Sequence, residues 1–144
     1  MPLIFDAKVA LFEALKGLVP AGVQCTFAET GQSDRRQQLW LGATTDEELE
    51  PAGMRAGPRK PTNVTGYVEA HAVVIAPGDP IGAERGAYVL RDVVADACRA
   101  VDRASVAGLL DLRPESSTVE TAETTDGAYS ALTVRVRVRG RTTT

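Results

Sequence analysis

The closing stretch of this sequence, residues 129–139, alternates so regularly that it limits the folds open to the chain. Its apolar positions are Leu132, Val134, Val136 and Val138, and the positions between them are Thr133, Arg135, Arg137 and Arg139. Successive side chains of a β-strand point to opposite faces, so a period of two is typical of a strand with one buried face. Another layer of secondary structure has to cover the apolar face.

Two stretches with helical periodicity can supply that layer, residues 5–19 and residues 82–103. Apolar side chains recur in both at intervals of three and four residues, which is typical of an amphipathic helix. In the first stretch we expect a buried stripe of Phe5, Val9, Phe12, Leu15 and Val19, beside Leu11 and Leu18. In the second we expect a stripe of Tyr88, Val89, Val93, Ala97 and Val101, beside Val94 and Cys98.

Four more stretches are predicted to be strands: residues 22–28, 37–43, 63–75 and 117–123. Turn residues suggest that the first two form a hairpin, and that residues 117–123 and 129–139 form another. The order α–β–β–β–α–β–β predicts an α+β fold, a mostly antiparallel sheet of about five strands with two helices packed on one face. We expect residues 1–144 to form a single domain, since this length is close to the commonest domain size.

Residues 44–62 interrupt this pattern with a long segment that begins acidic and ends basic. Its prolines and glycines disfavour regular structure, so we expect an irregular loop. Loops of this length in compact domains usually have a function. The candidate partner contacts in the segment are Glu47, Glu48, Arg55, Arg59 and Lys60.

The polar face of the closing strand carries Arg135, Arg137 and Arg139, a row about 13 Å long from the rise of ~3.3 Å per residue. Arginine binds carboxylates and phosphates alike. The row is therefore a solvated outer face, a ladder of salt bridges between subunits, or a contact with nucleic-acid phosphate. For the second interpretation, the acidic residues of segment 44–62 in a neighbouring copy are possible partners. The lack of aromatic residues interleaved with the arginines in the sequence disfavours binding of a single nucleic-acid strand.

The sequence contains no recognisable arrangement of residues for catalysis or for metal binding. His71 is the only histidine, whereas a typical zinc site needs several His or Cys ligands. Cys25 and Cys98 fall on faces expected to be buried, where thiols are inert. The glycines of residues 78–86 do not have the spacing of a nucleotide-binding loop. We therefore predict a protein that is not an enzyme and that holds no cofactor and no metal.

The overall charge disfavours a nucleic-acid-binding module. The chain has 16 basic and 19 acidic side chains and a net charge of −3, whereas proteins that bind duplexes usually carry a positive excess. No apolar stretch approaches the ~20 residues of a membrane span, and the N-terminus lacks the pattern of a signal peptide. We expect a protein made in the cytoplasm, with no membrane partner.

Four stretches carry a resemblance to a known family: residues 5–27, 65–70, 87–97 and 131–138. They contain a helix leading into a strand, a long middle strand, the main helix and the closing strand. In this order and size the chain resembles the tail terminator proteins of long-tailed, non-contractile bacteriophages, the group that includes the minor tail protein U of phage lambda. The family shares pattern more than signature residues, so the resemblance assigns no binding residue.

The resemblance implies a virion assembly protein, located at the head-proximal end of the tail. Such a protein forms a homohexameric ring that caps the tail tube, where it contacts the tail tube protein. It presents a surface to the neck or stopper protein of the head and makes a passing contact with DNA. In that setting segment 44–62 is an arm that orders on assembly. The alternatives are a head-closure or head–tail connector protein of the neck, a small nucleic-acid-binding module, and a small enzyme or ligand-binding domain with an unrecognised pocket.

Overall fold

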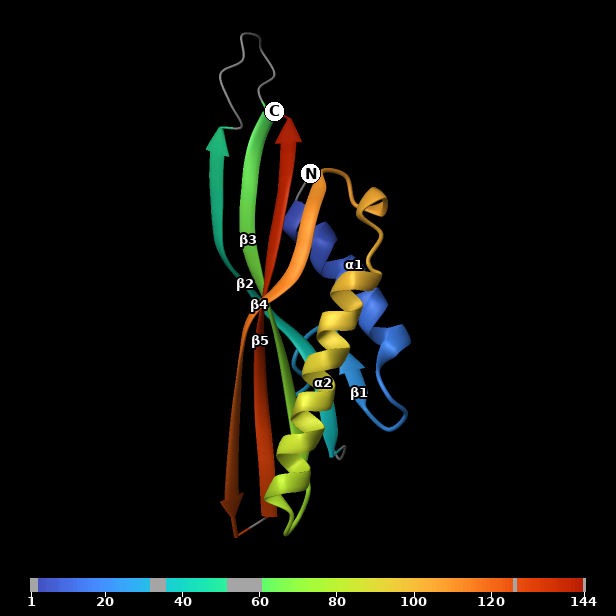
Figure 1. Cartoon of the computed structure of the whole chain (residues 1–144), viewed down its shortest axis with the longest axis vertical. Coiled ribbons are helices and arrows are strands. Elements are labelled where there is room, and N and C mark those ends of the chain that lie inside the picture. Colours follow the sequence, from blue (N-terminus) through green and yellow to red (C-terminus); the bar gives the residue numbers. More distant parts are fainter. Residues whose placement is uncertain (1–2, 32–35, 52–60, 126, 144) are drawn as a thin grey trace.

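The computed structural model describes residues 3–31, 36–51, 61–125 and 127–143. Within these ranges the elements are α1 (Leu3–Leu18), β1 (Gln24–Thr26), β2 (Gln37–Pro51), β3 (Pro61–Ile75), α2 (Pro80–Ala100), a short 3-10 helix η1 (Arg103–Ser105), β4 (Leu109–Thr124) and β5 (Gly127–Thr143). Figure 1 shows both α-helices on one face of a strongly twisted sheet. The predicted α+β class is confirmed. In the described part of the chain, no helix is long and apolar enough to span a membrane.

The strands follow the order β1-β2-β3-β5-β4. The two longest pairings, β3 with β5 and β5 with β4, are antiparallel. The predicted hairpin between residues 22–28 and 37–43 is wrong, because β1 pairs with β2 in parallel. The chain leaves the sheet at Phe27, whose ring packs edge-on against Phe12 of α1 at 5.6 Å between centroids. This contact anchors the end of β1 on the helix layer.

The irregular loop predicted for residues 44–62 is also wrong at both of its ends. Strand β2 continues to Pro51 and β3 begins at Pro61, while residues 52–60 lie outside the described residues. Two register shifts, between Leu41 and Thr44 and between Thr45 and Glu48, keep β2 paired with β3. Pairing with a long neighbouring strand thus outweighs the low strand propensity of an acidic sequence.

The strand predicted for residues 117–123 begins earlier, because β4 starts at Leu109. It contains Pro114, which has no N–H for a sheet hydrogen bond. A register shift between Pro114 and Ser116 accommodates this residue. The position fits the rule that proline in a sheet occurs at edge strands and bulges, since β4 is an edge strand.

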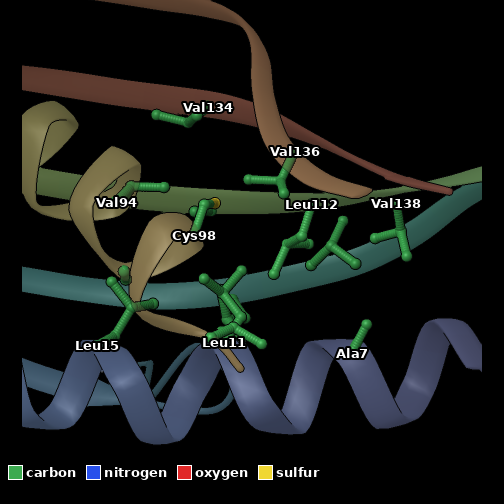
Figure 2. Close-up of a cluster of buried hydrophobic side chains, with 14 of the residues drawn as sticks. Ala7, Leu11, Leu15, Val94, Cys98, Leu112, Val134, Val136 and Val138 are labelled. Carbon is green, nitrogen blue, oxygen red and sulfur yellow. The ribbon is translucent and has the colours of Figure 1, made fainter. Parts of the chain in front are cut away.

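The core lies between the helices and the inner face of the sheet. Figure 2 shows Ala7, Leu11 and Leu15 of α1 pointing toward Val134, Val136 and Val138 of β5, with Val94 and Cys98 of α2 beside them. The alternation predicted for β5 is confirmed, since Leu132, Val134, Val136 and Val138 are all buried. Cys98 is buried as expected, whereas Cys25, expected in the core, is only half-buried.

The buried stripes of both helices are rotated from those predicted. Phe5 is 52% exposed, Tyr88 41% and Val89 49%, while α2 buries the stripe Ala83, Ala87, Leu90, Val94, Ala97 and Cys98. Gly86 explains the rotation of α2, since an added Cβ would lie 2.9 Å from Cγ1 of Val74 on β3. The close approach places mostly small residues on the buried side of α2, together with Leu90 and Val94, and leaves Tyr88 and Val89 outside.

Candidate interaction surface on the outer face of the sheet

The candidate interaction surface is the face of the sheet that points away from the helices, called here the outer face. Its central residues come from alternate positions of β3 and β5: Tyr67, Glu69, His71, Val73 and Ile75, and Tyr129, Ala131, Thr133, Arg135, Arg137 and Arg139. Within the described residues, these side chains are half-buried or exposed, and no second layer covers them. This face is therefore available for a partner.

Arg137 is held in the middle of this face without full use of its hydrogen-bonding groups. Its side chain is only 22% exposed, and its Nη2 lies 3.6 Å from Oδ2 of Asp111. Arg113, directly opposite Arg137 in the β4–β5 register, places its Nε 3.1 Å from the same oxygen. Nε and Nη2 of Arg137 have no hydrogen-bond partner within the described part of the chain. One carboxylate oxygen thus forms ion pairs with two arginines. Because like charges directly opposite each other on paired strands are destabilising, this oxygen offsets part of their repulsion.

Arg135 is fixed from two sides. Its guanidinium carbon lies 3.7 Å from the ring centroid of Tyr67, and its Nε lies 3.8 Å from Oε2 of Glu115. Such a cation–π contact orients a guanidinium over an aromatic face. Arg139, the last of the row, is exposed and lies opposite Asp111 in the register. The cluster has a positive excess: Arg113, Arg135, Arg137 and Arg139 against Asp111 and Glu115.

The row of three arginines thus lies on one strand face, as the alternation predicted, but its role in an interface stays a prediction. The other candidate contacts are not brought to it by the described structure. Glu47 and Glu48 belong to β2, where only the backbone is described. Arg55, Arg59 and Lys60 lie outside the described residues.

Beside the arginines, a histidine joins residues from three strands. Nδ1 of His71 lies 3.3 Å from Oγ1 of Thr133, Nε2 lies 3.2 Å from Oε2 of Glu69, and the ring stacks on Trp40 at 5.8 Å between centroids. Gly42 makes room for this ring, because an added Cβ would lie 2.6 Å from Nε2 of His71.

A hydroxyl, an imidazole and a carboxylate in this order are the side chains of a hydrolytic triad. A triad also needs backbone N–H groups to bind an oxyanion. Strand β5 is paired on both sides, with β3 and with β4, so the N–H groups near Thr133 are used within the sheet. The described residues also contain no group of three or more His, Cys, Asp or Glu that could hold a metal ion. The contacts with Thr133, Glu69 and Trp40 fix the ring of His71 on the outer face.

One end of the outer face is apolar. Ile75 is 37% exposed and Tyr129 38%, and they border a hollow of about 140 Å³ together with Val73. This patch was not predicted from the sequence, although the alternation of the two strands contains a signal for it. Val73, Ile75 and Tyr129 occupy positions of their strands at which most other residues are polar, which marks an apolar patch on an open face.

A separate hollow of about 450 Å³ lies at the β2 edge, lined in part by Lys8, Phe27, Trp40 and His71. Nζ of Lys8 donates to the carbonyl of Gly42 at 2.6 Å and lies 4.8 Å from the Phe27 ring centroid. Burial lowers the pKa of Lys8. The lysine satisfies a carbonyl just beyond Trp40, the last β2 residue that pairs with β1.

No family model matches this sequence, and no curated protein matches it. Among solved structures, the chain is similar to one chain of the virion of a native gene transfer agent particle. The two share 18% sequence identity with a TM-score of 0.49, over 92% of this chain and 94% of the other. A likeness at this level does not carry an argument about function.

Proposed function

We propose that this chain is a structural protein of a phage-like virion, namely a tail terminator that forms a homohexameric ring at the head-proximal end of the tail tube. The sequence resemblance described above suggests the role. The observation that supports it most directly is the outer face of the sheet, which carries an apolar patch and an excess of arginine and which no layer of the described chain covers. Surfaces of this kind usually mark a protein contact.

The proposal assigns the arginine row to contacts between subunits. Arg137 has donors that no described residue uses in a hydrogen bond, and a carboxylate from a neighbouring subunit would accept from them in a bidentate pair. The acidic stretch that contains Glu47 and Glu48 belongs to β2, beside the central strands of the sheet. In the proposed ring these residues, with Arg55, Arg59 and Lys60, contact the next subunit, the tail tube protein or the neck protein.

The proposal also holds that the chain is not an enzyme and that the whole of residues 1–144 acts as one domain. The backbone N–H groups of β5 near Thr133 are used in pairing with β3 and β4 and are not available to an oxyanion. A head-closure or connector protein of the neck would use the same surface, and binding to purified tail tube protein separates the two roles.

A nucleic-acid-binding role is the second candidate, favoured by one observation. The structure places aromatic rings among the arginines, with Tyr67 under Arg135 and the Trp40–His71 stack nearby. Stacking rings beside cations are typical of surfaces that bind single strands. The net charge of −3 disfavours this role.

The deciding experiment is the solution mass by light scattering over a range of concentrations, with and without tail tube protein. A ring-sized species is expected for the natural chain, and Arg137→Ala should shift it toward monomer. Lys16→Ala is the matched control, because Lys16 is an exposed base of α1 that pairs only weakly with Glu13 at 3.6 Å. A strict monomer that ignores the tube protein would refute the terminator role, and binding of an oligonucleotide that weakens steeply with salt would support the second candidate.

A further inference from the structure

The helix layer carries a second apolar patch, on the opposite side of the molecule from the outer face. On α2, Ile81 is 71% exposed, Val89 49% and Tyr88 41%. These residues share one side of the helix, since they are spaced by seven and eight residues, and the buried stripe that begins at Ala83 occupies the other side. Ile81 and Tyr88 border an open hollow of about 460 Å³. We call this surface the α2 patch.

The α2 patch and the apolar end of the outer face, called here the sheet patch, lie at the same end of the molecule. Strand β3 ends at Ile75 and α2 begins at Pro80, so a short turn separates the two patches along the chain. Figure 1 shows the start of α2 beside the end of β3 and the β4–β5 turn. The molecule therefore has one apolar end with an exposed patch on each of its two faces.

From this placement we propose that the α2 patch of one copy docks on the sheet patch of the next copy, with all copies in the same orientation. This inference rests on the proposed function, because it specifies the contact between the subunits of the ring. The two patches differ, so the contact is heterologous. Each copy contacts one neighbour through its α2 patch and the other neighbour through its sheet patch. A heterologous contact repeats until the rotation closes a ring.

The charged residues beyond the patches match in the same arrangement. Along α2, Asp92 and Asp96 follow the apolar residues on the same outward side, with exposed fractions of 71% and 57%. From Ile81 to Asp96 the helix rises about 22 Å at 1.5 Å per residue. Along β5, Tyr129 lies about 20 Å from Arg135 and about 26 Å from Arg137 at ~3.3 Å per residue. Docking of the apolar patches therefore brings the carboxylates of α2 to the level of the arginine row.

In the single chain, Asp92 and Asp96 pair with Arg91 and Arg99 of the same helix. Exposed pairs of this kind contribute little to stability, so they can exchange partners at low cost. Arg137, by contrast, is three-quarters buried, and among the described residues its Nε and Nη2 have no hydrogen-bond partner beyond the 3.6 Å ion pair of Nη2 with Asp111. A carboxylate from the neighbouring α2 would complete it. A nucleic acid on the outer face would also contact the arginines but would leave both apolar patches in water, which favours a second copy as the occupant.

Two half-blocked variants test this contact. Val89→Lys blocks the α2 patch and leaves the sheet patch intact, whereas Tyr129→Lys blocks the sheet patch and leaves the α2 patch intact. Each variant alone should remain monomeric by light scattering. An equal mixture should form a species of two chains and no larger one, because one intact contact joins the intact face of each. Leu18→Lys is the matched control, an equally exposed apolar residue outside both patches at 43% exposure, and it should leave assembly unchanged.

The outcomes separate this inference from the proposed function. If the natural chain forms rings and both variants still do so, the contact is wrong while the ring stands. If both variants are monomeric but their mixture is too, the heterologous contact is wrong. A natural chain that remains monomeric with and without tube protein refutes both. Thermal unfolding of each variant checks its fold, and Val89→Ser and Tyr129→Ser replace any lysine variant that fails to fold, with the expected result of at least a tenfold weaker self-association.

Discussion

Substitution of Gly108 by alanine is expected to lower the free energy of unfolding by more than the backbone strain of an alanine at positive φ. Gly108 has φ +84 and lies just before β4. Its carbonyl accepts a hydrogen bond from the N–H of Arg141 at 2.9 Å, which joins the start of β4 to the end of β5. An added Cβ would fall inside contact distance of the carbonyl oxygen of Arg141, a backbone atom that cannot rotate away.

The magnitude follows from comparison with a second glycine. Gly78 has φ +73 and no atom within 4 Å of an added Cβ, so Gly78→Ala introduces backbone strain alone, about 1–2 kcal/mol. Gly108→Ala adds the displacement of Arg141, about 1–3 kcal/mol by analogy with overpacking. The gain from a stiffer unfolded chain is common to both variants and cancels in the difference. At about 2–4 °C per kcal/mol, Gly108→Ala should melt at least about 2–4 °C below Gly78→Ala.

Thermal unfolding followed by circular dichroism, with chemical unfolding as a second measure, tests this expectation. Gly17→Ala completes the series, because Gly17 lies in α1 with open space around it and no positive φ. It should raise stability by up to about 1 kcal/mol, the helix preference of alanine over glycine. Equal melting temperatures for Gly108→Ala and Gly78→Ala would refute the argument that the approach of Arg141 limits this position.

Two further predictions concern the buried thiol of Cys98 and the half-buried amine of Lys8. Burial raises the pKa of Cys98 to about 12 from 9.0. The unfolded chain releases this proton first, so the free energy of unfolding should fall by about 1.4 kcal/mol per pH unit between pH 9 and about pH 12. Urea unfolding at pH 8 and pH 10 should show that extra loss in the natural chain and not in Cys98→Ala, and the same loss in both would contradict it. Lys8→Met removes the donor to Gly42 and should cost about 1–2 kcal/mol in urea unfolding, against about 0.5 kcal/mol or less for the exposed Lys16→Met; equal effects would show that the bond to Gly42 adds nothing.

The elements with a strict local period were predictable from the sequence. The buried faces of β3 and β5 follow from alternation, because successive side chains of a strand point to opposite faces and the helices cover one of them. The helices were located correctly, but Tyr88 and Val89 were expected inside and lie outside. The periodicity of apolar residues predicts which side of a helix is apolar, but it contains no information on how closely the helix packs against the sheet. That distance is set by the approach of Gly86 to Val74, which only the packed structure contains.

Pairings between distant segments were the main source of error. The parallel β1–β2 pair and the extension of β2 to Pro51 depend on contacts with Phe12 and with β3, and local turn residues suggested otherwise. The order of strands in a sheet is decided by which pairing buries more surface and satisfies more backbone groups. That balance is a property of the whole chain.

The candidate surface was likewise predictable in part from local sequence and in part only from the pairing of strands. The sequence by itself determined that Arg135, Arg137 and Arg139 share one face, since the period of a strand is local. Only the tertiary structure decided what meets them: Tyr67 from β3, Asp111 and Arg113 from β4, and an apolar end at Ile75 and Tyr129. The physical reason is register, because the neighbours of a strand residue across a sheet are set by the pairing of the whole strands and not by the residues next to it in sequence.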